Sequence, residues 1–291
     1  MNTLSFSQIG IVGTGRVARA LALGLQNHSS APLMVWGRTP AKCREAVGHL
    51  AHAQAVSSLS DIVDTCDVVA IAVADDAILE IVRTISEAGA LSQAPLVFHV
   101  SGGSGTAVLE PLRQMGAKTA AIHPAMTFTG EPELELERMA GSRFAVTGSS
   151  PESTLLAQSI VETLRGISVE IPEGSRALYH AALCHAANHL VTLFASASHA
   201  LRSAGVDDPT GLLAPLARAA LENSIANGFG ALSGPVLRGD NDTIRSHLAA
   251  LESDCPELLA SYRAMALATA EELERSSDPL NRANLLKLLG K

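Results

Sequence analysis

The feature that most constrains the fold is a glycine-rich turn close to the start of the chain. Residues 9–12 form a short apolar, β-branched run, and Gly13-Thr14-Gly15-Arg16-Val17-Ala18 follows it directly. Residues 18–26 then have the composition of a helix. A strand, a G-x-G-x-x-A spacing and a helix, in this order, are the fingerprint of a dinucleotide-binding βαβ unit.

Each small residue of the turn has a separate role in such a unit. Gly13 permits the tight turn, Gly15 lets the backbone approach a pyrophosphate, and Ala18 allows the helix to pack closely on the strand. The backbone N–H groups at the helix start would hold the anion. A glycine turn without a ligand is the alternative, but the order of the flanking elements favours binding. We therefore expect the cofactor to contact Gly13, Thr14, Gly15, Arg16 and Val17.

The end of the second predicted strand indicates which dinucleotide binds. A carboxylate about 20 residues after the fingerprint would accept the ribose 2′-hydroxyl of NAD and repel a 2′-phosphate. The sequence here is Gly37-Arg38-Thr39, and Lys42 follows one helical turn later. Arg38 can bind a phosphate with two N–H groups, and Thr39 can donate its hydroxyl. This favours NADP(H), unless Arg38 is only a solvated surface residue.

The first half of the chain alternates short strands with helical stretches. Strands are expected at residues 9–12, 33–36, 67–73, 96–100, 120–122, 144–147 and 168–171. This alternation predicts a parallel, doubly wound sheet. The nearly continuous apolar runs at 68–73 and 97–100 indicate strands with helices on both faces.

Beyond about residue 172 the strand pattern stops. Residues 174–204 read as one long, alanine-rich helix ended by Gly205. Asp208 and Pro209 provide an N-cap and a first-turn residue for another helix, and further helical patterns cover residues 243–251, 256–275 and 279–289. The 291 residues thus predict two domains: an NADP-binding α/β Rossmann domain at residues 1–172, and an all-α domain for substrate binding and dimerisation at residues 173–291.

The composition excludes several classes of protein. Hydrophobic residues make up 47% of the chain and charged residues 17%, which predicts a large buried core rather than disorder. A formal net charge of −8 without a run of Lys and Arg argues against nucleic-acid binding. No uninterrupted apolar run approaches the roughly 18 residues of a membrane span. Small-molecule partners are expected, together with a second copy of the chain in a homodimer.

The cysteines and the first residues of the chain suggest a cytoplasmic location. Cys43, Cys66, Cys184 and Cys255 lie far apart without a C-x-x-C pair, so we expect neither a disulfide framework nor a metal site. The first seven residues lack the basic and apolar regions of a secretion signal.

Loops after later strands are expected to complete the cofactor site, because ligands of doubly wound sheets bind outside the carboxyl ends of the strands. The loops in question are Ala74-Asp75-Asp76 and Ser101-Gly102-Gly103. Their small residues suit a close approach of the cofactor, although Gly102-Gly103 could be only a turn. The candidate cofactor residues from these loops are Ala74, Asp75, Ser101 and Gly102.

Candidate catalytic residues come from both halves of the chain. His123 and Thr127 follow a predicted strand, and a histidine can donate a proton near neutral pH; a structural loop histidine is an equal alternative. His180, Cys184 and Asn188 recur every four residues on the long helix and share a face. His180 and Asn188 are candidates for lining the active site, with Cys184 interpreted as a core residue.

A loop between the later helices contains a second group of polar candidates. Ser233-Gly234-Pro235 is followed by Arg238-Gly239-Asp240. Ser233 and Arg238 could bind substrate, with Arg238 holding a carboxylate. An ordinary interhelical turn with a surface pair between Arg238 and Asp240 is the alternative.

Several motifs together carry a family resemblance. They are the N-terminal fingerprint, Val100-Ser101-Gly102, His123-Pro124 with Thr127-Phe128, Tyr179-His180 leading to Asn188, and Ser233-Gly234-Pro235 with Arg238-Gly239-Asp240. The chain resembles, over nearly its whole length, Rossmann-like proteins with a DUF2520 C-terminal domain. That family is similar to 6-phosphogluconate and β-hydroxyacid dehydrogenases, ketopantoate reductases and pyrroline-5-carboxylate reductases. The resemblance implies an NADP-binding domain, a helical domain around one long helix, and commonly a dimer formed by the helical domains.

One departure from the wider group concerns the proton donor. Where hydroxyacid dehydrogenases and ketopantoate reductases carry Lys-x-x-x-Asn, alignment on Asn188 places Cys184 at the lysine position. Reduction of a carbonyl generates an alkoxide that needs a proton, so His180 or His123 would have to supply it. The leading hypothesis is an NADPH-dependent reductase of a small, ketopantoate-like 2-oxo acid. An imine-acid reductase of the pyrroline-5-carboxylate type and an NADP(H) sensor without turnover are the alternatives.

Overall fold

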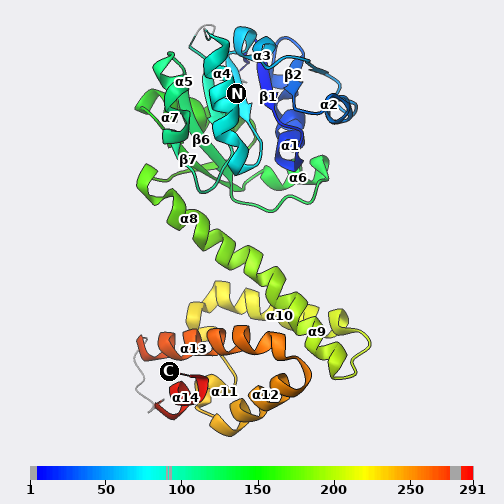
Figure 1. Cartoon of the computed structure of the whole chain (residues 1–291), viewed down its shortest axis with the longest axis vertical. Helices are drawn as coiled ribbons and strands as arrows, with labels where there is room; N and C mark the ends of the chain where they lie inside the picture. The colour runs from blue at the N-terminus through cyan, green and yellow to red at the C-terminus, as the bar shows by residue number, and fades with distance from the viewer. Residues whose placement is uncertain (1–4, 90, 92–93, 276–282, 291) are drawn as a thin grey trace. The chain divides into compact units, whose positions relative to one another are not determined.

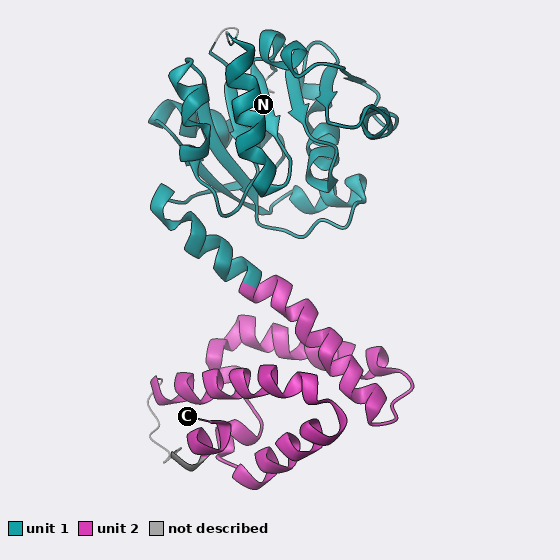
Figure 2. Ribbon diagram, viewed as in Figure 1, with its two compact units in different colours: residues 1–184 teal, residues 185–291 magenta. Residues whose placement is uncertain are grey.

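The protein consists of two compact units, residues 1–184 and 185–291 (Figure 2). The computed structural model describes residues 5–89, 91, 94–275 and 283–290. None of the helices in this described part combines the length and apolar character that a membrane span requires.

The described residues of the first unit form one sheet of eight strands in the order β3-β2-β1-β4-β5-β6-β7-β8 (Figure 1). The strands are β1 (Ile9–Val12), β2 (Leu33–Trp36), β3 (Ala53–Ala55), β4 (Val68–Ile71), β5 (Leu96–His99), β6 (Lys118–Pro124), β7 (Arg143–Gly148) and β8 (Ile167–Glu170). Strand order reverses direction at β1 and β4, which is the switch point where doubly wound folds bind ligands.

One pair of strands departs from the predicted all-parallel sheet. β7 runs antiparallel to β6, with Phe144 beside Pro124 at the carboxyl end of β6. The connection between them contains helix α6 (Pro132–Met139), which packs on α1 instead of crossing back over the sheet. The chain therefore re-enters the sheet at the end where β6 left it.

Helices cover both faces of this sheet (Figure 1). They are α1 (Arg16–Leu25), α2 (Pro40–Val47), α3 (Leu59–Thr65), α4 (Ile78–Ala88), α5 (Glu110–Gln114) and α7 (Pro151–Thr163), while α8 (Arg176–Leu183) follows the last strand. Val69 and Ile71 of β4 pack with Ile62, Ile78 and Ile85 on one face, whereas its Val68 and Ala70 belong to the core of the other face. Burial on both faces explains why β4 lacks a polar alternation.

The secondary structure of the described residues in the second unit is helical. They form α9 (His189–Ser203), α10 (Pro209–Asn227), α11 (Pro235–Arg238), α12 (Asn241–Asp254), α13 (Leu259–Arg275) and α14 (Ala283–Leu289). Asp208 caps α10 as predicted, because its Oδ1 accepts a hydrogen bond of 2.9 Å from the Gly211 N–H. In the predicted helix at 279–289, residues 279–282 lie outside the described residues, and α14 covers all of the rest.

The predicted helix at 174–204 is present with one irregularity. A 3-10 turn, η4 (Glu173–Ser175), leads into α8, and a π-helix at Cys184–Asn188 separates α8 from α9. Gly205 follows with a φ of +85°, the left-handed conformation expected of a glycine that ends a helix.

The first turns of this helical segment belong to the first unit. The guanidinium of Arg176 donates hydrogen bonds to the carbonyl oxygens of Ser101, Ser104 and Ala145. The Glu173 carboxylate accepts from the backbone N–H groups of Thr106 and Ala107. The change from strands to helices and the division into compact units therefore fall at different places in the chain.

Candidate active site

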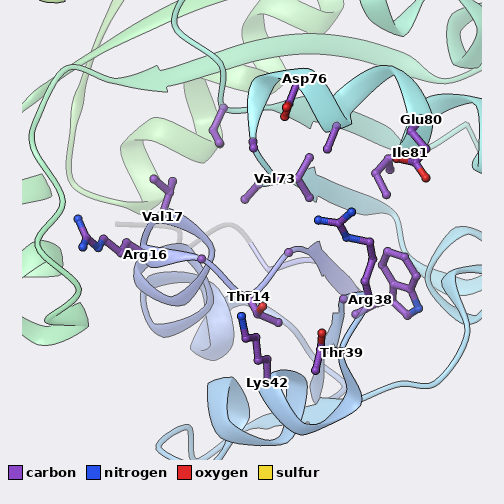
Figure 3. Close-up of a pocket in the computed structure, with 18 of the residues that line it drawn as sticks. Thr14, Arg16, Val17, Arg38, Thr39, Lys42, Val73, Asp76, Glu80 and Ile81 are labelled. Carbon is purple, nitrogen blue, oxygen red and sulfur yellow. The ribbon is translucent and has the colours of Figure 1, made fainter.

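A pocket of about 580 Å³ lies at the carboxyl ends of β1, β2 and β4 (Figure 3). Its lining residues are Gly13, Thr14, Gly15, Arg16, Val17, Trp36, Gly37, Arg38, Thr39, Lys42, Ala72, Val73, Ala74, Asp76, Ala77, Glu80, Ile81, Val100 and Phe128. The pocket thus occupies the switch point of the sheet, where a dinucleotide is expected.

The two glycines of the turn are required for different reasons. Gly13 has a φ of +131°, and a Cβ atom there would lie 2.1 Å from the Ala72 carbonyl oxygen. This position needs glycine for the fold itself. A Cβ atom on Gly15 would meet nothing within 4 Å. Since Gly15 also lines the pocket, its missing side chain leaves room for a ligand to approach the backbone.

The N-terminus of α1 is prepared for an anion. Gly15 is its N-cap residue and offers no side-chain cap, and the first turn contains no acidic residue. The first N–H groups of a helix have no partner within it, and together they carry a partial positive charge. A pyrophosphate would satisfy both requirements.

A second uncapped helix start faces the same pocket. Thr39 is the N-cap residue of α2 without a side-chain cap bond, and the first turn of α2 also lacks an acid. Arg38 and Lys42 are exposed beside it. Lys42 and Thr39 lie across the pocket from Asp76 and Glu80 (Figure 3). The sequence had indicated the loop that contains Asp76, but not Glu80. The basic group and the start of α2 together could hold a phosphate.

Not all of the predicted cofactor residues line this pocket. Nine of them do: Gly13, Thr14, Gly15, Arg16, Val17, Gly37, Arg38, Thr39 and Ala74. The other three, Asp75, Ser101 and Gly102, belong to an adjacent group. The Ser101 hydroxyl donates to the Asp75 carboxylate at 2.9 Å and accepts from the Ser104 N–H. Asp75 and the loop at 101–103 therefore contribute to a second group rather than to the pocket wall.

The second group brings together two predicted histidines and one tyrosine. The Nδ1 atom of His123 lies 2.9 Å from the Tyr179 hydroxyl oxygen, and the rings of His123 and His180 meet edge to face with centroids 5.7 Å apart. A Cβ atom on Gly102 would clash with His180 and approach His123 Nε2 to 3.0 Å. Glycine at 102 is thus what lets both histidines approach the end of β5. We call His123, Tyr179 and His180 the histidine–tyrosine cluster.

Two buried residues support this cluster. His99 Nδ1 accepts from the Ser101 N–H, and its Nε2 donates to the Gly105 carbonyl oxygen at 2.8 Å. Burial lowers the pKa of His99, and the nearby Arg176 charge lowers it further. Arg176 is 1% exposed, and its guanidinium also lies 5.7 Å from the centre of the Tyr179 ring. Neutral His99 and charged Arg176 fix the loop on which Ser101 and Gly102 stand.

The protonation states within the cluster follow from burial. Desolvation, the Arg176 charge and the neighbouring His180 together lower the pKa of His123 to about 4. Desolvation raises the pKa of Tyr179, although Arg176 partly opposes it. At neutral pH His123 is therefore a neutral imidazole and Tyr179 a neutral phenol. The hydroxyl of Tyr179 can donate a proton, whereas His123 carries no extra one.

Four of the six predicted catalytic and substrate-binding residues are not members of the histidine–tyrosine cluster. Thr127 is exposed in the loop after β6. Asn188 closes the π-helix, and Ser233 and Arg238 are exposed around α11, all within the second unit. Asp240 caps α12 by accepting from the Thr243 N–H and hydroxyl. That carboxylate is therefore part of a helix start.

Tyr179, His99 and Arg176 were missing from the predicted site. Tyr179 precedes His180 in the sequence, so its position was visible but its hydroxyl was not considered. His99 sits in an apolar run and Arg176 at a helix start. Only the contacts of these two side chains reveal that they support the cluster.

Comparisons with known proteins agree with this architecture. Residues 4–124 match a Rossmann-like domain model, and residues 142–269 match DUF2520, a domain of unknown function. No curated protein matches the sequence.

Solved structures with the same fold include several reductases. A protein of Bacteroides fragilis, provisionally named an NADP oxidoreductase, has 21% identity and a TM-score of 0.75 over 91% of this chain and 98% of its own. A reductive aminase of Aspergillus terreus in complex with NADPH has 20% identity and a TM-score of 0.63 over 94% of both chains. An imine reductase of Myxococcus stipitatus in complex with NADP+ has 18% identity and a TM-score of 0.65 over 92% of this chain and 93% of its own. At these identities the likeness shows the fold.

Proposed function

We propose that this chain, a Rossmann-like protein with a DUF2520 domain, is an NADPH-dependent reductase of small 2-oxo acids. The observation that carries the proposal is the pocket at the switch point, with a phosphate site at Arg38, Thr39 and Lys42. The histidine–tyrosine cluster lies at the carboxyl ends of β5 and β6. Val100 and Phe128, which follow these two strands, also line the pocket.

The residues of the pocket fit NADP(H) at both of its phosphate groups. The open space at Gly15 and the uncapped start of α1 suit the pyrophosphate. The uncapped start of α2, with two basic side chains, suits the 2′-phosphate. Relatives of the same fold are solved with NADPH or NADP+, which supports the same choice here. Bound NADPH would supply the hydride.

The histidine–tyrosine cluster fits the second requirement of carbonyl reduction, a proton for the new alkoxide. Tyr179 is the preferred donor, because its phenol is protonated at neutral pH and His123 is not. If His123 Nδ1 carries hydrogen, it donates to the Tyr179 oxygen and leaves the phenolic proton for the substrate. The same bond then stabilises the phenolate. The His180 ring also contacts the His123 ring.

The charge around the cluster favours a substrate with a carboxylate. The described contacts of the Arg176 guanidinium are carbonyl and hydroxyl oxygens, so its charge is not cancelled by a bonded carboxylate. Glu173 acts on this charge without a bond to it, and Asp75 acts on His123 in the same way. A buried positive charge without a bonded carboxylate attracts an anion and disfavours a cation. A 2-oxo acid meets this preference and also uses the proton donor.

Imine acids are the second candidate. Several proteins of this fold are named imine reductases or pyrroline carboxylate reductases. A cyclic imine acid carries the same carboxylate, but its protonated form arrives with the proton that Tyr179 would otherwise supply. The two substrate classes therefore differ in how strongly they depend on Tyr179.

A substrate screen tests the proposal. NADPH oxidation should be followed with the full chain against 2-oxo acids, cyclic imine acids, and the corresponding aldehydes or imines without a carboxylate. We expect turnover with a 2-oxo acid and much less with its uncharged analogue. NADPH binding without turnover on any of these compounds would reject the reductase and favour an NADP(H) sensor.

A further inference from the structure

We propose that His199, Cys255 and Glu257 of the helical unit form a binding site for a zinc ion, separate from the cofactor pocket. The nitrogen, sulfur and oxygen atoms that these side chains offer all lie within 4.8 Å of one another. The residues come from two segments far apart in the sequence, α9 and the corner between α12 and η7 (Pro256–Leu258). The expectation of no metal site rested on cysteine spacing, which could not show this juxtaposition.

The three ligands are arranged for a metal that enters from solvent. The Nε2 atom of His199 lies 2.9 Å from a carboxylate oxygen of Glu257, and both side chains are more than half exposed. Cys255 is only 2% exposed. Its backbone is held on both sides, because its N–H donates to Leu251 and its carbonyl accepts from Leu258. The backbone of Cys255 is thus held in place, and the two exposed side chains can adjust to its thiol.

The ligand set selects the metal. A thiolate, an imidazole and a carboxylate are all ligands of Zn²⁺, whereas Mg²⁺ and Ca²⁺ prefer oxygen alone. With zinc bonds of about 2.0–2.3 Å, the ligand atoms of a tetrahedral site lie roughly 3.5 Å apart. The observed limit of 4.8 Å needs an adjustment of about 1 Å, which side-chain rotation can provide. Water would occupy the fourth position.

Binding changes the protonation of the site in a defined way. The Cys255 thiol loses its proton to the buffer as the zinc–sulfur bond forms. His199 Nε2 gives up the hydrogen that it shares with Glu257, which passes to the solvent while the neutral imidazole keeps its hydrogen on Nδ1, and two bonds to the metal replace the hydrogen bond. The metal would then join the end of α9 to the α12–η7 corner. Because such a site forms only in the folded chain, metal binding should stabilise the helical unit.

Cobalt is the probe for the thiolate ligand. The full chain, freed of metal and kept reduced with a phosphine, is titrated with Co²⁺ and then with Zn²⁺. We expect a thiolate-to-cobalt charge-transfer band that saturates at one Co²⁺ per chain and disappears when Zn²⁺ is added. Zn²⁺ should also raise the thermal midpoint. Absence of the band in the wild-type chain overturns the proposal.

Variants locate the site. Cys255→Ser should abolish the band. Replacement of a residue that only hydrogen-bonds to a metal ligand typically weakens metal binding by roughly 10–100-fold. Because His199 would itself be a ligand, His199→Gln should weaken Co²⁺ binding by more than this. His199→Gln should also remove the Zn²⁺-dependent rise in thermal midpoint, which keeps the test valid if Cys255→Ser does not fold.

Two matched controls address other metal-binding groups. The Sγ atom of Cys184 lies 3.6 Å from His180 Nε2. The Nδ1 atoms of His185 and His189 lie 3.0 Å apart. Cys184→Ser and His185→Gln should keep the band at full strength. A band that survives Cys255→Ser, or that Cys184→Ser removes, overturns the assignment.

Discussion

His123 and Tyr179 are joined by a contact of 2.9 Å between the imidazole Nδ1 and the phenolic oxygen. His123 lies next to the last residue of strand β6, and Tyr179 lies on α8, the helix that follows all of the strands. The pair therefore combines a rigid support with a side chain that can exchange a proton. It is the feature on which the proposed chemistry most depends.

Replacing Tyr179 tests the proton donor. We expect Tyr179→Phe to lower turnover of a 2-oxo acid by about 10²–10⁴ while leaving the Kd for NADPH unchanged. The chain offers a matched control, since its other tyrosine, Tyr262, also contacts a histidine Nδ1, that of His247, at 2.8 Å. Tyr262→Phe should leave turnover unchanged. Steady-state kinetics and fluorescence titration measure both quantities; equal turnover in the two variants would exclude Tyr179 as donor.

The lowered pKa of His123 predicts acid sensitivity. Its pKa falls from the usual 6.5 to about 4 on folding, so protons bind the unfolded chain more strongly. The stability linked to this residue is fully present above pH 6.5 and is lost as the pH falls toward 4, by roughly 3 kcal/mol at most. The free energy of unfolding, obtained from urea titrations at intervals of about one pH unit between pH 7.5 and pH 4, measures this loss.

His123→Asn should flatten this pH dependence, whereas replacement of the exposed His49 should not. His99 has a lowered pKa as well, so part of the acid sensitivity should remain in His123→Asn. An unchanged slope in His123→Asn would mean that the imidazole is not buried as described.

The two glycines of the turn should respond differently to substitution. Gly15→Val should fold normally, at a cost below about 1 kcal/mol for the changed cap, but weaken NADPH binding by at least about tenfold. Its side chain would enter the open space at the start of α1. Gly13→Ala should instead destabilise the fold by roughly 1–3 kcal/mol or more, because of its positive φ and its contact with Ala72. Thermal unfolding and NADPH titration of both variants separate the effects; tight binding by Gly15→Val would contradict them.

The basic group at α2 predicts discrimination between cofactors. Arg38→Ala should weaken NADPH binding by about 1.5–3 kcal/mol, the range for a hydrogen bond to a charged group, with little change for NADH. Lys42→Ala should act in the same direction but less, since it contributes charge without a two-pronged contact. Calorimetric titration with both cofactors provides the measurement. Equal losses for NADH and NADPH would remove the 2′-phosphate from this position.

The helical unit is expected to form a homodimer. The apolar side chains of α10 include Leu216, 64% exposed, and Ile225, 78% exposed, and large exposed apolar patches mark interaction surfaces. The double variant Leu216→Asp/Ile225→Asp should be monomeric by light scattering at micromolar concentration, whereas the wild type should be dimeric. Leu155→Asp is the control, because Leu155 is similarly exposed, at 67%, on α7 of the first unit. A monomeric wild type would reject the dimer.

Much of the fold was predictable because its signals are local. The strand before the fingerprint, the apolar runs of β4 and β5, and the caps at Asp208 and Gly205 all act through neighbouring residues. β3 escaped prediction since Ala53-Gln54-Ala55 has no β-branched or aromatic residue. The direction of β7 depends on where α6 packs, and the π-helix depends on a backbone pattern that periodicity does not encode.

The site was predictable in position more than in detail. Strand ends identified nine residues of the pocket, because every parallel strand delivers its following loop to the same edge. The same reasoning grouped Asp75 and Ser101 with the cofactor, since a position in the sequence does not say where a side chain points. Arg176 and His99 support the site through contacts with residues distant in the sequence. Such contacts are a property of the folded chain.

The anchoring of the helical segment by Glu173 and Arg176 determines how the protein can be divided. A fragment that stops at residue 172, where the strands have ended, would leave the carbonyl oxygens of Ser101, Ser104 and Ala145 without their guanidinium partner. It would also remove the carboxylate that caps the turn at Thr106. A fragment that contains the sheet and folds on its own therefore has to include α8. Chimaeras that combine this sheet unit with the helical unit of a relative should be joined after Leu183.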